Sequence, residues 1–217
     1  MQRYEFFSIF VPQTLLYIME QNIIQKNMWQ MASKAGLILG LISTVYMFSA
    51  HIDFQSIFIS LGVPEEKSFA GIWKLIPLVI GWILWFAKFA GCVWAMNFFM
   101  NRFAAENPEI DNKTTFRMGM ITALLSGLLY SGAIFADIAY IHADIYTEQI
   151  GQAMQSMASM MDSNTRSMMD TYIENLPQIN FFTNLIYCFL FGTVLSKILS
   201  RNIPSKDPFA DYKPSEQ

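Results

Sequence analysis

Charged residues are scarce in this chain of 217 residues. Asp, Glu, Lys and Arg together make up 14% of it, whereas hydrophobic residues make up 53%. An ordinary soluble domain carries roughly 25% charged residues, because its surface must interact with water. The shortage of charge therefore predicts that most of the surface faces lipid and that the chain is an integral membrane protein.

The chain also lacks an excess of basic residues and a set of cysteines that could form a disulfide framework. With a net charge of -3, the chain lacks the positive footprint that holds nucleic acid, so nucleic-acid binding is excluded. Cys92 and Cys188 both lie in apolar stretches, where a thiol acts as a small buried hydrophobe. They therefore give no sign of a disulfide-stabilised extracellular domain.

The common catalytic motifs are absent as well. The sequence contains no phosphate-binding loop, no H-E-x-x-H or C-x-x-C motif and no G-x-S-x-G nucleophile motif. The two histidines, His51 and His142, are few for an acid–base or metal site, and the predicted spans hold no paired carboxylates at one depth. We therefore expect the chain not to be an enzyme and to need no cofactor.

Four long apolar stretches dominate what remains. At a rise of 1.5 Å per residue, about 20 apolar residues cross the roughly 30 Å hydrocarbon core of a bilayer. The stretches that meet this requirement are residues 31–50, 71–96, 118–141 and 179–199. We therefore predict an all-α membrane protein, a four-transmembrane-helix bundle that covers residues 31–199.

Three polar segments complete the predicted organisation. Residues 143–178, between the third and fourth spans, are too hydrophilic to cross a membrane and are predicted to form an extracytoplasmic amphipathic helical segment. Residues 1–30 are predicted to be a cytoplasmic extension without a signal-peptide cleavage site, and the sequence leaves open whether they lie partly upstream of a start at Met28. Residues 200–217 are predicted to be a disordered cytoplasmic tail.

The orientation is predicted from the distribution of Lys and Arg, because cytoplasmic loops carry an excess of both. Ten of these residues fall on one side of the predicted membrane and three on the other, which puts both termini in the cytoplasm. The ten are Arg3, Lys26, Lys34, Arg102, Lys113, Arg117, Lys197, Arg201, Lys206 and Lys213, and the three are Lys67, Lys74 and Arg166.

Small residues recur at every fourth position in each predicted span. This spacing puts them on one helix face, where neighbouring backbones can approach closely. We predict that they serve tight packing inside the bundle, with dimerisation as the alternative. They are Ala32, Gly36, Gly40 and Thr44; Ala87, Gly91 and Ala95; Gly119, Ala123, Gly127 and Ser131; and Cys188, Gly192, Ser196 and Ser200.

Ionisable residues within the predicted spans are candidates for function, because a charge in the membrane is costly. Asp137, Lys74 and His51 fall at similar depth near the outer ends of three spans, and they are predicted to form a polar cluster. Such a cluster serves either as a structural ion pair or as part of a transport path. Lys88, near the predicted inner end of its span, is expected to extend its ammonium group to the headgroups.

Methionines are concentrated in the polar segment 143–178. Met154, Met157 and Met161 follow a helical spacing together with Ile150 and Tyr172, which predicts an apolar face that lies on the bilayer or closes the bundle. The alternative is a soft-metal site, because thioether sulfur favours ions such as Cu(I).

Several features recur in one order along the chain. They are the Met28–Ser43 run with its two glycines, the Trp82–Arg102 run, the Asn107–Gly119 loop, and the Asn180–Ser200 span followed by a polar tail. In these features the chain resembles a bacterial family of four-span inner-membrane proteins, domain-of-unknown-function family 4199. The resemblance implies a four-span fold, a place in the bacterial inner membrane and a start near Met28, and it implies no known activity.

Two functions are compatible with these observations. The first is a non-enzymatic scaffold or accessory subunit, whose partner is another membrane protein or a second copy of the chain within the lipid bilayer. The alternative is a small transporter or soft-metal-handling protein that uses the Asp137 and Lys74 cluster or the methionine segment. A cavity that reaches Asp137 favours transport, whereas a bundle filled with Leu and Phe argues against it.

The topology gives the first testable prediction. Because ten of thirteen flanking Lys and Arg lie on one side, reporters fused after Asn107 and after Ser205 should stay cytoplasmic. Reporters placed near Glu65 and Ser163 should be exported. Paired alkaline phosphatase and fluorescent-protein fusions measure both outcomes, and an exported C-terminal reporter would show that the number of spans is odd.

Overall fold

The computed structural model describes residues 13–49, 52, 70–107, 110–157 and 162–203, with side chains for residues 21–49, 52, 78–107, 110–153, 162, 165 and 167–203. The described chain is helical. Its elements are α1 (Gln13–Ser49), α3 (Ala70–Glu106), α4 (Asn112–Ala136), the π-helix η1 (Asp137–Ile141), α5 (Ala143–Met157), α6 (Ser163–Glu174) and α7 (Leu176–Asn202).

The predicted number of spans is confirmed. Among the described residues, four helical stretches are long and apolar enough to cross a membrane, at Gln21–Ser49, Leu78–Glu106, Asn112–Ile141 and Leu176–Asn202. These four stretches indicate a multi-pass membrane protein.

Two of the predicted helix ends differ from the observed ones. Helix α1 begins at Gln13, well before residue 31, and α3 continues from residue 96 to Glu106. Polar side chains follow residue 96, and they form hydrogen bonds and an ion pair along the helix. Asn101 donates from Nδ2 to the Asn97 carbonyl oxygen at 2.9 Å, and Arg102 pairs with Glu106 at 2.8 Å.

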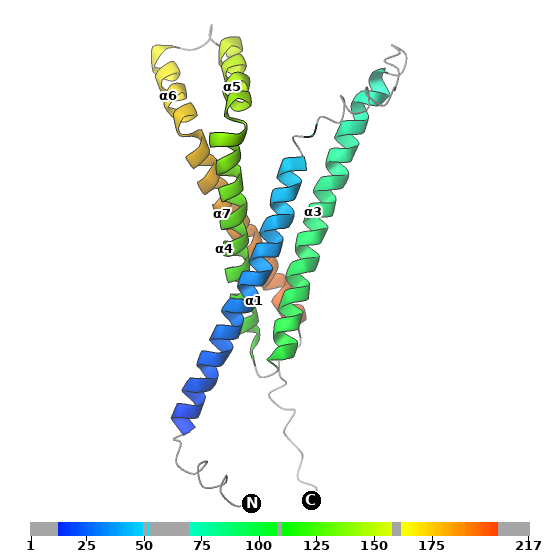
Figure 1. Ribbon diagram of the computed structural model, residues 1–217, viewed down its shortest axis with the longest axis vertical. Coiled ribbons are helices and arrows are strands. Elements are labelled where there is room, and N and C mark those ends of the chain that lie inside the picture. The colour runs from blue at the N-terminus through cyan, green and yellow to red at the C-terminus, as the bar shows by residue number, and fades with distance from the viewer. Residues whose placement is uncertain (1–12, 50–51, 53–69, 108–109, 158–161, 204–217) are drawn as a thin grey trace, which may run out of the picture.

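Helix α4 lies at the centre of the bundle. It packs most extensively against α1 on one side and α7 on the other, whereas α3 packs mainly against α1 (Figure 1). Antiparallel α4 and α7 continue upward into α5 and α6, which form a helical hairpin above them in this view. We refer to the end of the bundle that bears α5 and α6 as the upper end, and to the other as the lower end.

The small-residue prediction is confirmed as packing within the chain for its glycines on α1, α4 and α7, whereas on α3 a Cβ atom added at Gly91 would meet only Ile42 at 3.9 Å. A Cβ atom added at Gly36 on α1 would lie 2.8 Å from Leu125 Cβ on α4. Added Cβ atoms at Gly119 and Gly192 would collide with Ser196 and Ala123 across the α4–α7 contact. The backbones therefore approach each other where glycine permits it.

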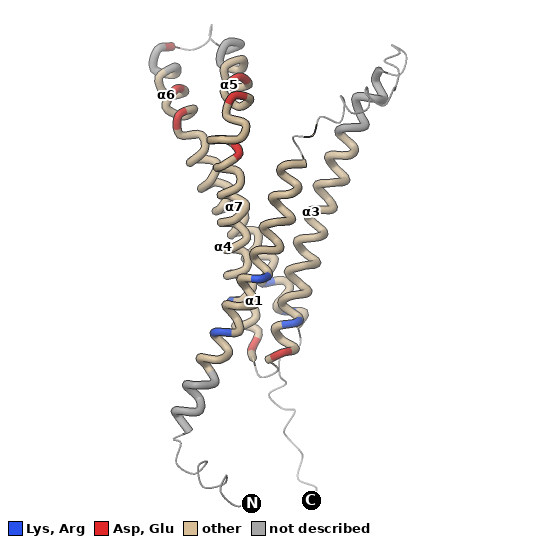
Figure 2. The backbone as a smooth tube through the Cα atoms, viewed as in Figure 1, with Lys and Arg blue, Asp and Glu red and all other residues tan. Residues whose placement is uncertain are grey.

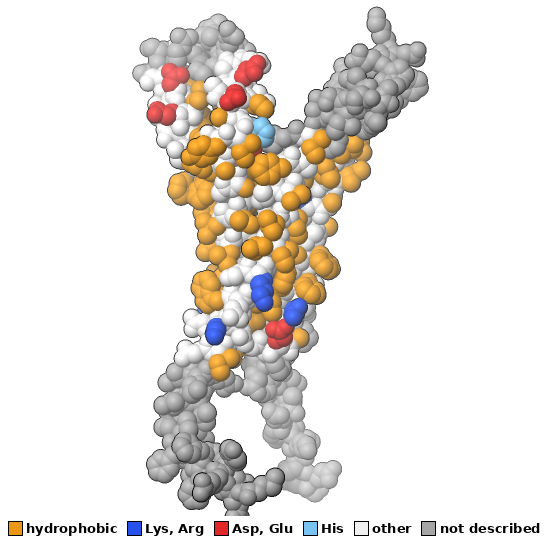
Figure 3. Space-filling view, viewed as in Figure 1, with side chains coloured by type: hydrophobic (Ala, Val, Ile, Leu, Met, Phe, Trp, Pro, Cys, Tyr) orange, Lys and Arg blue, Asp and Glu red, His pale blue; other side chains and the backbone are white. Residues whose placement is uncertain are grey.

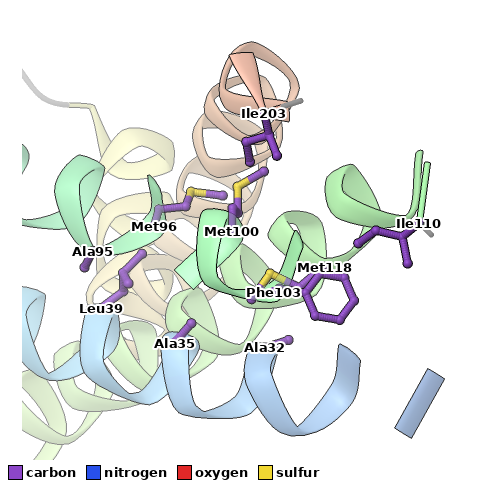
Figure 4. Packing of buried hydrophobic residues seen from close by; sticks show 10 residues of the cluster. All are labelled: Ala32, Ala35, Leu39, Ala95, Met96, Met100, Phe103, Ile110, Met118 and Ile203. Carbon is purple, nitrogen blue, oxygen red and sulfur yellow. The ribbon is translucent and has the colours of Figure 1, made fainter. Parts of the chain in front are cut away.

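The hydrophobic core occupies the lower end, where α3 ends and α4 begins. Above it α3 diverges from α4 and α7, so that the upper half of the bundle is more open (Figure 1). The core side chains come from α1, α3, α4, the α3–α4 connection and the residue directly after α7 (Figure 4). They are Ala32, Ala35, Leu39, Ala95, Met96, Met100, Phe103, Ile110, Met118 and Ile203.

Charges are distributed unevenly along the long axis. Described Lys and Arg lie in the lower part, whereas acidic residues occur on α5 and α6 at the upper end and also at the lower end, at Glu106 and Asp111 (Figure 2). Between the two ends a broad belt of hydrophobic side chains covers the visible surface (Figure 3). A belt of this kind fits a lipid environment.

The segment between the third and fourth spans is helical, as predicted, but it consists of two helices. His142 links η1 to α5, since its backbone N–H donates to the Asp137 carbonyl oxygen at 2.8 Å and its own carbonyl accepts from Tyr146. Asn175 similarly links α6 to α7. The side of the membrane on which this hairpin lies stays a prediction.

The glycine contacts give the second prediction. Gly36→Ala should lower the free energy of unfolding by about 1–3 kcal/mol, because its new methyl group meets the Leu125 side chain and the Thr122 backbone. Gly132→Ala is the matched control, since nothing lies within 4 Å of a Cβ added there. It should be neutral or stabilising by up to about 1 kcal/mol. Thermal unfolding in detergent measures both, and equal effects would contradict the packing described.

Candidate functional site

A break in helix geometry at the upper end of α4 organises the candidate site. Over Asp137–Ile141 the helix adopts π geometry, in which the backbone N–H of His142 donates to the carbonyl oxygen of Asp137, five residues before it. Single π turns within α-helices occur frequently at functional sites. The side chains that this π turn orients are therefore candidates for function.

The π turn brings three polar side chains together. The Asp137 carboxylate is buried, with 1% of its surface exposed. Its Oδ1 lies 2.6 Å from His142 Nδ1, and its Oδ2 accepts a hydrogen bond of 3.0 Å from the Tyr146 hydroxyl. Both carboxylate oxygens therefore have partners in α5 or immediately before it, as a buried charge requires.

Tyr146 acts as a donor in this cluster. Burial, together with the hydrogen bond to Asp137 and the negative charge of that carboxylate, raises the pKa of Tyr146 to about 12. The phenol therefore keeps its proton at neutral pH and continues to donate it to the carboxylate. His142, when protonated, adds an ion pair to the other oxygen.

A pocket of about 440 Å³ opens beside this cluster. Its polar lining consists of Asp137 and Tyr146 with Tyr172 on α6 and Asn180 and Asn184 on α7. Its apolar lining consists of Met47, Ile134, Ile138, Ile150 and Leu176. The volume lies in the range of small-molecule sites, roughly 300–1,000 Å³, and the mixture of apolar walls with a few polar groups is typical of them.

The two asparagines give the pocket both acceptors and donors. Asn180 donates from Nδ2 to the Leu176 carbonyl oxygen at 3.0 Å, and Asn184 donates from Nδ2 to the Asn180 carbonyl oxygen at 2.9 Å. Each of these bonds uses one of the two N–H groups of the amide, so each side chain retains its oxygen as an acceptor and one N–H as a donor.

A second polar group lies deeper in the membrane. The Lys88 ammonium group on α3 lies 4.8 Å from the ring centroid of Tyr46 on α1 and 4.9 Å from that of Tyr130 on α4. Two aromatic faces stabilise a cation that is removed from water. On the same two helices, Ser43 and Cys92 interact at 3.7 Å.

The Lys88 ammonium group faces the two tyrosines inside the bundle. Helix α3 continues past residue 96 to Glu106, so Lys88 lies about 27 Å from that helix end at 1.5 Å per residue. The expectation that its charge reaches the headgroups stays a prediction.

The other predicted site residues have different outcomes. Asp137 is placed as described above, but His51 and the side chain of Lys74 lie outside the described residues, so the predicted cluster of these three stays a prediction. Met161 and the side chains of Met154 and Met157 also lie outside them. Within the described part of the chain, no group of three or more His, Cys, Asp or Glu side chains is arranged to hold a metal.

The Asp137 cluster generates the third prediction. Tyr146→Phe should lower the free energy of unfolding by about 1 kcal/mol, because a hydrogen bond to a buried carboxylate is lost. Tyr140→Phe is the matched control, since Tyr140 is 77% exposed, and its effect should be within about 0.5 kcal/mol of zero. In an Asp137→Ala background the Tyr146→Phe change should have no effect. Additive losses in this double-mutant cycle would show that the two side chains do not interact.

Comparison of the chain with protein-family models, with curated proteins and with solved structures finds no match. The resemblance to a bacterial four-span family therefore stays a prediction from the sequence. The function is argued below from the pocket, the Asp137 cluster and the position of Lys88.

Proposed function

We propose that this chain is a small integral membrane protein of the transporter class, which binds a polar solute in the pocket beside Asp137. The observation that carries the proposal is the pocket of about 440 Å³ that reaches a buried carboxylate within a membrane span. Burying a carboxylate within a membrane span is costly. Its presence there is therefore a default indication of a functional site such as a solute or ion path.

The chemistry of the lining suggests the kind of solute. Asn180 and Asn184 each offer an amide oxygen and one N–H group, whereas Tyr146 directs its proton to Asp137, so the wall combines several acceptors with a few donors. The apolar wall of Ile134, Ile138 and other residues suits a short hydrocarbon body. A solute with several N–H or O–H donors, such as an amine or a polyol, matches this surface.

The shape of the bundle supports a path with one closed end. Lower down, Met96, Met100, Phe103 and Met118 are at most 1% exposed and close the bundle. Tyr130, one of the two tyrosines that contact Lys88, precedes Asp137 by about 10 Å along α4. A pocket near one end of the bundle and a closed core near the other form the arrangement expected for one state of an alternating-access cycle.

The scaffold hypothesis receives less support from the structure. It depended partly on the small-residue ladders as surfaces for a partner. Gly36, Gly119 and Gly192 instead contact other helices of the same chain. The ladders on α1, α4 and α7 are therefore used within the bundle.

The proposal includes a location and an orientation. The distribution of Lys and Arg supports cytoplasmic termini, and the resemblance to a bacterial four-span family implies the bacterial inner membrane. In this orientation the upper end, with α5 and α6, is extracytoplasmic and the pocket lies toward that side.

Water access to the pocket tests the proposal. In a chain with Cys92→Ala and Cys188→Ala, Asn184→Cys should react with a charged, membrane-impermeant thiol reagent applied from outside intact cells. Val194→Cys on the same helix is the control for a lipid-facing position, since Val194 is 60% exposed on the apolar part of α7. We expect labelling of Asn184→Cys to be at least about tenfold faster, because a thiol must reach water to ionise and react.

Two outcomes would contradict the proposal. If Asn184→Cys is as unreactive as Val194→Cys, the pocket is dry and no solute enters it from water. If Ala123→Cys, at a position 4% exposed between α4 and α7, reacts as fast as Asn184→Cys, the reagent reports a loosened bundle rather than a pocket.

A further inference from the structure

Four cations lie close together at the lower end of the bundle, where α4 begins and α7 ends. We call them the basic patch, and each of the four side chains is exposed. They are Lys113 and Arg117 on α4, and Lys197 and Arg201 on α7.

Contacts between α4 and α7 join the four side chains into one surface. The Ser196 hydroxyl donates to the Phe116 carbonyl oxygen at 3.0 Å and fixes the register of the two helices. The Lys197 ammonium lies 5.1 Å from the Phe116 ring, so the α7 cation lies directly on α4. Lys113 precedes Phe116 by three residues and therefore shares its helix face.

The patch has little negative charge opposite it among the described residues. Asp111 is the carboxylate next to Lys113 and Arg117. Hydrogen bonds from Thr114 lower the pKa of Asp111, and the positive charges of Lys113 and Arg117 lower it further. In the part of the chain that the structure describes, the ion pairs are Arg102 with Glu106 and His142 with Asp137. Four cations against one carboxylate leave a positive surface with net charge of about +3.

The position of the patch matches the headgroup layer. Its residues lie at the ends of the spans Asn112–Ile141 and Leu176–Asn202, where the apolar part of each helix gives way to polar residues. From Lys197, an exposed apolar strip runs along the same face of α7 through Val194 and Leu190, which are 60% and 59% exposed. Cations at headgroup depth that adjoin an apolar strip fit a phosphate with acyl chains attached.

We propose that the basic patch is a binding site for the headgroup of an anionic phospholipid, with an acyl chain along Val194 and Leu190. A lipid phosphate receives charge-assisted hydrogen bonds from Arg117, Arg201 and the two lysines. Inorganic phosphate satisfies the cations but makes no use of the apolar strip. The lipid is therefore the occupant that both features select.

Lipid retention by the purified full-length chain tests the site. Native mass spectrometry would measure the bound fraction of phosphatidylglycerol and of phosphatidylcholine with the same acyl chains. The patch variant is Lys113→Gln/Lys197→Gln, and the control variant is Lys26→Gln/Lys34→Gln, which removes two exposed lysines from α1. We expect phosphatidylglycerol to be preferred, and the patch variant to lose about fivefold in affinity for each cation removed. The control variant should change by less than about twofold.

Three results would overturn the proposal. Equal losses in the patch and control variants would show attraction to overall positive charge, and equal retention of the two lipids would show that the phosphate charge is not selected. Displacement of the lipid by millimolar inorganic phosphate would show a site for the free anion. Because all four patch side chains are exposed, both variants should unfold at the temperature of the unmodified chain, which checks that the fold is intact.

Discussion

The close approach of α4 to its two neighbours is the contact on which the rest of the structure depends. Lipid gives helices no hydrophobic reason to associate, so association relies on van der Waals contact between backbones that come near each other. Gly36 allows this on the α1 side, and Gly119 and Gly192 allow it on the α7 side. With α4 held between two helices, the polar residues at its upper end gain a fixed position.

The uneven packing of α3 follows from the same need for close contact between helix backbones. Helix α3 contacts α1 more than α4 or α7, and no side-chain or backbone atom lies within 4 Å of a Cβ added at Gly81. Three of its aromatic side chains, Trp82, Phe86 and Trp94, are more than half exposed and so face the lipid. The bundle is therefore a tight three-helix unit with a fourth helix at its side, and the cluster of Lys88 with Tyr46 and Tyr130 connects the two.

The number of spans could be predicted from the sequence because twenty apolar residues are an unambiguous signal. Helix ends could not, since Asn97, Asn101 and Arg102 look like loop residues until their bonds within α3 are known. The site was predictable only in part. Asp137 was identified as a buried charge, but in an α-helix His142 would point about 140° away from it. Only the π turn puts them on one face, and no residue pattern in the sequence indicates that turn.

The π turn also determines how the pocket wall is aligned with the bundle. Such a turn is an α-helix that accommodates one extra residue, and each residue of an α-helix advances the direction of the next by about 100°. If Asp137–Ile141 returned to α geometry, α5 would rotate by about this angle around its own axis while α4 stayed still. Tyr146 and Ile150 would then leave the wall that they now form. A deletion or insertion of a single residue here would alter the lining of the pocket without touching the packing below it.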